Sequence, residues 1–256
     1  MMKANIYSIT GEKKGQADLP IQFSEPIRFD LIKRAVFSIQ TKKRQAYGSD
    51  PLAGTKQGAA TTKRRQKYKT TYGKGVSRIK RKYSFSRGMQ FGFIGAFVAN
   101  AISGRKAFAP RSEKILIENI NKKENRKAIR SAMAANVETL KIIDDKFMDL
   151  KKTKEVQKSL ESLGLKDEIE KSKDKKIRAG KGTRRGRKYV RRRGPLFVVS
   201  KETAAVKAAK NIAGVDIINV KKLNAEMLCP GFKSRRNSFW TKDAIEILAK
   251  EKLYIW

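Results

Sequence analysis

The 256-residue chain carries 61 Lys and Arg residues against 24 Asp and Glu residues, which leaves a formal net charge of +37 at pH 7. Such a chain repels itself unless a polyanion neutralises it, and nucleic acid is the usual one because each cation on a phosphate releases condensed counterions. Cys229 is the single cysteine and there is no histidine, which excludes an intramolecular disulfide, a cysteine-cluster zinc site and a histidine base. We predict no catalytic residue, no metal site and no cofactor.

Nothing in the sequence predicts a membrane partner or export. The most apolar stretch, Phe91 to Ile102, is shorter than the roughly 20 residues that a bilayer requires, and it contains Asn100. Met1 to Thr10 offers no sustained apolar run followed by a small-residue cleavage site. We expect a cytoplasmic location.

Two segments in the first half of the chain have the apolar spacing of an amphipathic helix. The first is predicted from Asp30, a candidate cap, to about Arg44. The second begins near Asn121, whose side chain is expected to cap the helix while Glu124 reaches back to the backbone. Each helix should bury one face in a core.

A third helix and two short strands are also expected. The helix runs from about Thr153 to Gly164, which stands in a good position for a C-cap. Ile142 and Ile143 indicate one strand, and Ala4 to Ile9 indicates a strand at the edge of a sheet.

The last quarter of the chain predicts a parallel crossover. Leu196–Val199 and Val215–Val220 are short runs suited to buried strands, and an alanine-rich helix is expected between them from about Glu202 to Lys210. A final helix from Thr241 would cover one face. The expected fold class is therefore α/β, a layered globular domain with a mostly parallel sheet flanked by helices.

A long basic segment interrupts this domain, and the sequence predicts no regular element between Arg44 and Asn121. Residues 45–111 contain a single acid, Asp50. Loops beyond roughly 12 to 15 residues are uncommon inside compact domains unless they are functional, and like charges keep this one from collapsing alone. We therefore expect residues 45–111 to be an extended RNA-binding loop, disordered in the free protein. The cations expected to bind RNA in or beside it are Arg44, Lys56, Lys63, Arg64, Arg65, Lys67, Lys69, Lys82, Arg87, Arg105, Lys106 and Arg111.

Aromatic residues are interleaved with these cations. Stacking on RNA bases is expected for those surrounded by Lys and Arg, namely Tyr47, Tyr68, Tyr72 and Tyr83. Phe91, Phe93 and Phe97 alternate with glycine and alanine, so ordinary packing is an equal alternative for them.

A second basic tract, residues 178–193, contains no acid and has three glycines among its cations. Arginine can contact two phosphate oxygens at once or stack on a base, which favours RNA over simple solvation. Its predicted RNA-binding residues are Arg178, Lys181, Arg184, Arg185, Arg187, Lys188 and Arg191.

Three other interpretations compete with RNA binding. The basic tracts could be solvated tails, although tails seldom lie inside a domain. Gly180-Lys181-Gly182-Thr183 lacks the spacing of a phosphate-binding loop, because Lys175 stands where its first glycine is needed. Asp144 and Asp145 could bind Mg²⁺ in a nuclease, but the solvated ends of strands look the same.

Several motifs resemble the large-subunit ribosomal protein four family in its archaeal form, over nearly the whole chain. Ser24-Glu25-Pro26-Ile27-Arg28 is similar to the lead-in to the family's first helix, and Tyr47-Gly48-Ser49-Asp50-Pro51-Leu52-Ala53-Gly54 to its loop entry. Gly73-Lys74-Gly75-Val76-Ser77-Arg78-Ile79-Lys80-Arg81 is similar to the segment at the family's loop tip. Gly104-Arg105-Lys106-Ala107-Phe108-Ala109-Pro110 is similar to the return.

This resemblance implies a non-enzymatic, structural constituent of the large ribosomal subunit that supports subunit assembly. Residues 1–44 and 112–256 would form the globular α/β domain, and residues 45–111 would penetrate large-subunit rRNA to reach the wall of the polypeptide exit tunnel. The implied partners are large-subunit rRNA, neighbouring ribosomal proteins and, at the tip, the nascent polypeptide. The tip residues are Gly73, Lys74, Gly75, Arg78, Lys80 and Arg81. Two rival classes are a DNA-compacting protein, which would need a reading helix, and a nuclease or nucleotide-binding enzyme, which would need a site.

Overall fold

The computed structural model describes residues 2–61, 63–232 and 236–255, and the chain divides into two compact units. Residues 1–43 and 117–256 form the first, here called the α/β unit. Residues 44–116 form the second, here called the basic unit.

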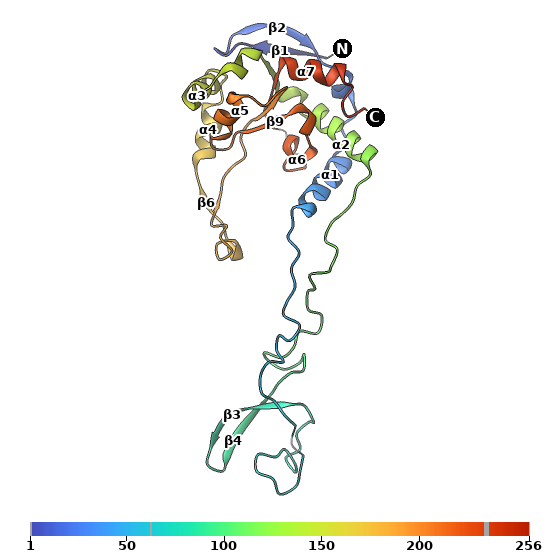
Figure 1. Cartoon of the computed structure of the whole chain (residues 1–256), viewed down its shortest axis with the longest axis vertical. Coiled ribbons are helices and arrows are strands. Elements are labelled where there is room, and N and C mark those ends of the chain that lie inside the picture. Colours follow the sequence, from blue (N-terminus) through green and yellow to red (C-terminus); the bar gives the residue numbers. More distant parts are fainter. Residues whose placement is uncertain (1, 62, 233–235, 256) are drawn as a thin grey trace. The chain divides into compact units, whose positions relative to one another are not determined.

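The α/β unit is built on a six-stranded sheet (Figure 1). Its strands are β1 (Lys3–Tyr7), β2 (Lys13–Asp18), β5 (Leu140–Ile143), β8 (Leu196–Val199), β9 (Asp216–Asn219) and β10 (Ser238–Thr241). The order is β2-β1-β5-β10-β8-β9, and among these strands only the β1–β2 pair is antiparallel. The mostly parallel α/β sheet predicted from the sequence is confirmed.

The crossover predicted for the last quarter of the chain is also present. β8 and β9 are parallel neighbours, in register from Leu196 opposite Asp216 to Val199 opposite Asn219, and α5 (Ala204–Lys210) connects them. Two strand predictions need correction. β1 is not at the edge, because the polar strand β2 pairs outside it, and β10 was not predicted although it lies between β5 and β8.

Helices cover both faces of the sheet. The remaining helices are α1 (Phe29–Lys42), α2 (Lys122–Ala135), α3 (Thr153–Ser162), α4 (Lys166–Lys173), α6 (Ala225–Leu228) and α7 (Lys242–Lys250). Short 3-10 turns are η1 (Ile21–Ser24), η2 (Val137–Thr139), η3 (Asp145–Asp149), η4 (Gly180–Gly182) and η5 (Val220–Lys222). One core lies between the sheet and α1, α2, α6 and α7, and the other between the sheet and α3, α4 and α5.

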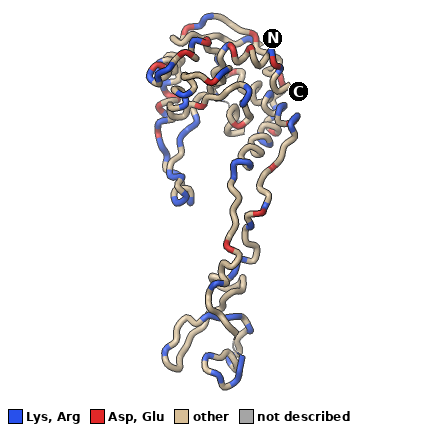
Figure 2. The backbone as a smooth tube through the Cα atoms, viewed as in Figure 1, with Lys and Arg blue, Asp and Glu red and all other residues tan. Residues whose placement is uncertain are grey.

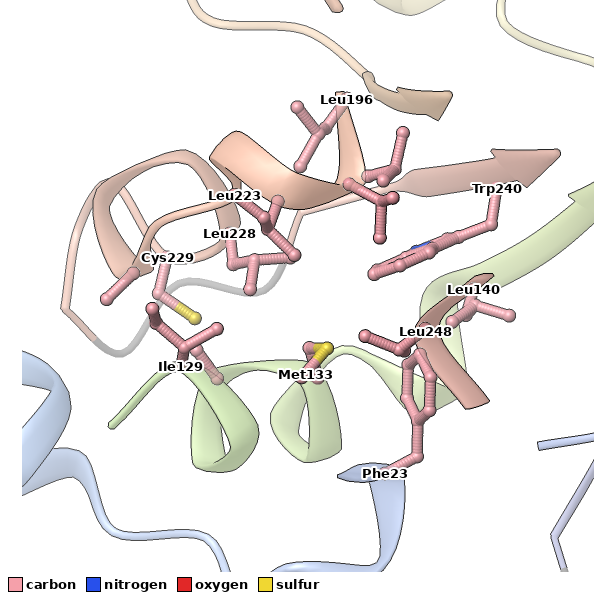
Figure 3. Packing of buried hydrophobic residues seen from close by; sticks show 14 of the residues in the cluster. Phe23, Ile129, Met133, Leu140, Leu196, Leu223, Leu228, Cys229, Trp240 and Leu248 are labelled. Carbon is pink, nitrogen blue, oxygen red and sulfur yellow. The ribbon is translucent and has the colours of Figure 1, made fainter. Parts of the chain in front are cut away.

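Successive side chains of the central strands point alternately into these two cores. On β10, Trp240 enters the first core and Phe239 the second, as successive side chains of a strand must. Trp240 is fully buried and meets Phe23 edge-to-face at 5.3 Å between ring centroids, with Met133 of α2 nearby (Figure 3). Phe239 stacks on Phe197, centroid to centroid at 5.0 Å.

Helix caps differ from two of the predictions. Asp30 lies in the first turn of α1 and forms an ion pair of 2.5 Å with Arg28, which is itself the residue before the helix. Asn121 precedes α2 but its side chain makes no capping bond, and Glu124 instead pairs with Arg34 at 3.4 Å. Gly164, predicted to end the third helix, follows α3 with a φ of +81°.

The basic unit contains a hairpin that the sequence did not predict. β3 (Arg81–Arg87) and β4 (Gln90–Gly95) pair antiparallel around a turn at Gly88 (Figure 1). The expectation that no regular element lies between Arg44 and Asn121 is therefore wrong. A further short pair, β6 (Lys176–Ile177) and β7 (Tyr189–Val190), frames the second basic tract in the α/β unit.

Candidate nucleic-acid interface

Most of the second basic tract, residues 178–188, is a solvent-exposed loop between β6 and β7, and its last arginines follow β7. All of its predicted RNA-binding cations are exposed, and Figure 2 shows Lys and Arg following one another along it. Its base is ordered by the main chain, because Arg178 N donates to Lys188 O at 2.8 Å, and the Arg178 side chain donates to Tyr189 O at 3.2 Å. The loop therefore presents many cations from one short pair of strands.

A buried arginine supports the end of this tract. Arg236 is 6% exposed and donates to the carbonyl oxygens of Gly194 and Pro195, at 2.6 and 3.2 Å, and to Asp216 Oδ2 at 2.7 Å. Burial lowers the pKa of Arg236, and the Asp216 carboxylate acts in the opposite direction. Arg236 joins the residues after the tract to β9.

A buried carboxylate on α6 contacts the residue before the basic unit and the last residue of the second tract. Glu226, whose side chain is 6% exposed, pairs with Lys43, the residue that precedes the basic unit. Its other oxygen lies 3.6 Å from Arg193, the last residue of the second tract. Glu226 has no local signal in the sequence, because only the fold brings it beside residues 33 and 183 positions away.

Two segments without helix or strand, residues 47–54 and 104–112, run side by side in the basic unit and are here called its stem. Ser49 N donates to Pro110 O at 3.0 Å. A side chain at Gly48 would place its Cβ 2.8 Å from Ser112 N, and one at Gly54, where φ is +81°, would collide with the Gly104 carbonyl. These glycines allow the two segments of the stem to approach closely.

Aromatic rings and cations form a cluster around the β3–β4 hairpin. Phe91 meets Tyr68 and Tyr83 edge-to-face, at 5.9 and 6.0 Å between centroids, and stacks on Phe93 at 5.7 Å. Lys74 Nζ lies 4.3 Å from the Phe91 centroid, a favourable cation–π distance. Phe91 and Phe93 therefore pack against other rings of this cluster, which is the alternative to stacking on RNA that the sequence left open for them.

The tyrosines expected to stack on RNA are partly engaged inside the chain. Tyr68 and Tyr83 donate from their hydroxyls to the carbonyls of Gly88 and Lys69, and Arg65 lies over the Tyr72 ring at 5.1 Å. Tyr68, Tyr72 and Tyr83 nevertheless stay 46% exposed, and Tyr47 is 60% exposed. Each ring keeps a surface open to a ligand.

The predicted cations of the basic unit fall into two groups. In the first, the side chain contacts another residue: Lys56 pairs with Asp50, Lys63 donates to Val76 O, Lys82 donates to Gln57, Arg81 donates to Ser77 O, and Lys69, Lys74, Lys80 and Arg65 lie over aromatic rings. In the second, no ion pair or side-chain hydrogen bond occurs within the described part of the chain. These are Arg44, Arg64, Lys67, Arg78, Arg87, Arg105, Lys106 and Arg111, all exposed.

The acidic pair considered as a Mg²⁺ site has other contacts. Lys14 pairs with Asp144 at 2.5 Å and lowers the pKa of that carboxyl, while Asp145 accepts a hydrogen bond from Asp243 N at 3.1 Å. Among residues 2–61, 63–232 and 236–255, no three His, Cys, Asp or Glu side chains are grouped to hold a metal ion. No helix in these same ranges is long and apolar enough to cross a membrane.

Comparison with known proteins decides between the classes of nucleic-acid-binding protein. Residues 17–251 match the model of the ribosomal protein L4/L1 family. The chain belongs to this family. It is 44% identical to the large ribosomal subunit protein uL4 of Nanoarchaeum equitans, over 99% of this chain and all of that protein. It is 40% identical to uL4 of Methanosphaera stadtmanae, with coverage of 97% and 96% respectively.

Family membership confirms the resemblance of the sequence to large-subunit ribosomal protein four, and the relatives confirm that it is of the archaeal form. A member of the L4/L1 family is a structural constituent of the large ribosomal subunit and not an enzyme. The rival readings as a nuclease, a nucleotide-binding enzyme or a DNA-compacting protein fall with this result. The family match does not identify which of the predicted cations contact RNA.

Proposed function

We propose that the basic unit and the tract 178–193 bind large-subunit rRNA, chiefly through its phosphates, and that this binding supports subunit assembly. The observation that carries the proposal is the set of exposed cations whose side chains have no partner among the described residues, of which Arg64, Lys67 and Arg105 are examples. The basic unit has only Asp50 and Glu113 as acids, and Asp50 is already paired with Lys56. The positive charge is therefore available to a polyanion.

The test removes unpartnered cations without touching the packing. A variant with Arg64, Lys67, Arg87, Arg105, Lys106 and Arg111 replaced by Gln should bind large-subunit rRNA more weakly. Its slope of log affinity against log salt should be less steep by about 4 to 5, because each lost phosphate contact contributes roughly 0.7 to 0.9. Filter binding at a series of salt concentrations measures both quantities.

A matched control removes the same charge elsewhere. Lys151, Lys154, Lys158, Lys166, Lys207 and Lys210 are exposed on and around α3, α4 and α5, where acids such as Glu155 and Asp167 are interspersed. Their replacement by Gln should change the slope far less. Equal effects of the two variants would mean that net charge alone attracts RNA, and would contradict an interface in the basic unit.

The segment Gly73 to Arg81 is proposed, from the resemblance to the family, to border the nascent polypeptide at the wall of the exit tunnel. Arg78 is the sharpest probe because its side chain is exposed and has no partner among the described residues. Deleting residues 74–80 would also remove Lys74 from Phe91, so a single substitution separates the two roles.

Arg78→Glu should leave subunits that assemble and sediment normally, but should change the stalling of particular nascent chains. Arg78→Lys, which keeps the charge, is the control. Toeprinting on stalling sequences and sucrose-gradient profiles are the measurements. Loss of subunit assembly from Arg78→Glu alone would contradict this assignment.

A further inference from the structure

The stem of the basic unit contains an open recess of about 700 Å³. Tyr47, Lys106, Phe108, Pro110 and Arg111 are among the residues that line it. A neighbouring recess of about 800 Å³ shares Lys106, Phe108 and Arg111. Both lie within residues 44–116, so the site belongs to one unit.

The aromatic lining of the recess is uncovered. Phe108 is 94% exposed and Tyr47 is 60% exposed. No ring contact within the described part of the chain involves either side chain, unlike Tyr68, Tyr83 and Phe91 of the hairpin cluster. Covering an exposed phenylalanine ring with a planar apolar partner lowers the free energy, because apolar surface is removed from water.

The walls of the recess are fixed by the backbone of the stem. The hydrogen bond from Ser49 N to Pro110 O joins the two segments of the stem close to Phe108, and Gly48 lets Ser112 approach to a distance that no side chain would permit. The site therefore does not depend on long flexible side chains for its shape.

The charge around the recess selects an anion. Lys106 and Arg111 are exposed and make no ion pair with any residue that the structure describes. Of the two acids that line the two recesses, Asp50 is paired with Lys56, so Glu113 alone opposes them. An apolar protein segment would cover Phe108 but would leave these cations unneutralised.

We propose that this recess takes one unstacked base of large-subunit rRNA, which stacks on Phe108, while Lys106 and Arg111 hold the phosphates of the same strand. Aromatic faces beside cations are the usual combination for binding an unstacked nucleotide. The inference rests on the proposed function, because it assigns a nucleotide subsite within the rRNA-binding unit.

The experiment compares the full-length chain with three single variants in binding to large-subunit rRNA over a series of salt concentrations. Phe108→Ala should weaken binding about tenfold. It should leave the slope of log affinity against log salt unchanged, because the side chain carries no charge. Phe108→Trp, which keeps an aromatic ring for stacking, should bind with the affinity of the wild type. Ile115→Ala is the matched control, since Ile115 is 86% exposed in the same segment but does not line either recess, and it should bind like the wild type.

The outcomes separate this inference from the proposed function. Steep salt dependence in the wild type with no loss in Phe108→Ala would overturn the base subsite and leave rRNA binding intact. Weak binding or a flat salt dependence in the wild type would overturn both. Normal rRNA affinity of Phe108→Ala combined with its failure to enter subunits would identify a protein segment as the occupant and also overturn the proposal.

Discussion

At the scale of single residues, the buried guanidinium of Arg236 should contribute strongly to the stability of the α/β unit. Its guanidinium satisfies the carbonyls of Gly194, Pro195 and Met227 and the carboxylate of Asp216, all within 3.2 Å. Removing one partner of a buried charged network leaves the others desolvated and unpaired.

Arg236→Met should therefore lower the free energy of unfolding by about 3 kcal/mol, the lower part of the usual range because Asp216 is 37% exposed. Urea denaturation followed by circular dichroism measures the change. Lys221→Met is the control, since Lys221 and Glu251 form an exposed pair and should contribute less than about 1 kcal/mol. Similar losses in the two variants would show that Arg236 is not the support of this region.

Cys229 provides a second residue-scale prediction. Burial raises the pKa of its thiol to about 11, against a weaker opposing hydrogen bond from Asn136. The folded thiol keeps its proton to a higher pH than an unfolded one. Its contribution to stability is thus present below the unfolded pKa of about 8.5 and is lost as the pH rises through about 11.

At pH 8, Cys229 should consequently resist thiol reagents until the α/β unit unfolds, because the thiolate is the reactive species. Labelling along a urea gradient should follow the loss of circular dichroism. A chain with Ser86→Cys, exposed in the β3–β4 hairpin, should take up one label at once in native buffer. Rapid labelling of the wild-type chain without urea would disprove the burial of this thiol.

At the scale of elements, α6 provides the carboxylate that pairs with the residue before the basic unit and with the last residue of the second tract. Glu226→Gln removes the charge that pairs with Lys43 and Arg193. Because both cations are about half exposed, water can solvate them, so the expected loss of stability is modest, about 1 kcal/mol.

The more specific readout of Glu226→Gln is local opening. Hydrogen exchange should accelerate around residues 41–45 and 191–196 and stay unchanged in β5 and β10. Glu202→Gln, which breaks only the exposed pair with Lys222, should alter neither region. Uniform acceleration over the whole sheet would indicate general destabilisation in place of an anchoring role.

Elements with a strong local pattern could be predicted from the sequence, and those defined by pairing could not. The predicted helices correspond to α1, α2, α3, α5 and α7, and β8 begins and ends at the predicted residues. Lys13–Asp18 has the polar sequence of a loop, and it becomes strand β2 because it pairs with β1. β3 was missed although its aromatics alternate with polar residues as in a strand, because the turn at Gly88-Met89 is not a common hairpin signal.

The residue types of the interface could be predicted from the sequence, but the contacts of their side chains could not. Charge runs revealed which segments carry cations, yet they could not distinguish Lys74, which lies over Phe91, from Arg64, which has no partner within the described residues. Phe108 escaped notice because a single phenylalanine between alanines gives no periodic signal. Its exposure becomes apparent only in the folded stem.

At the scale of the whole molecule, the division into two units predicts two levels of stability in the free protein. The α/β unit has two apolar cores. In the basic unit, by contrast, Ala96 is the one buried hydrophobic residue among those described. Ordering a backbone costs about 1 to 2 kcal/mol per residue, which buried apolar surface must offset.

Hydrogen exchange of the free protein should therefore be fast throughout residues 45–111 and slow in the strands of the α/β unit. Addition of large-subunit rRNA should protect residues 45–111, and addition of an equal concentration of a polyanion without bases, such as polyphosphate, should protect them less. Strong protection of this segment in the absence of RNA would show that it folds on its own.

The open edge of the sheet at β2 has a consequence for chains that have not yet met RNA. An edge strand offers unpaired N–H and C=O groups to any other strand, and this invites aggregation. In β2 the residues from Lys13 to Gln16 are exposed, polar or glycine, and the first two are lysines. An incoming strand would have to cover these charged side chains, which disfavours pairing at this edge, so chains synthesised in excess of rRNA should be protected from polymerising through their sheets.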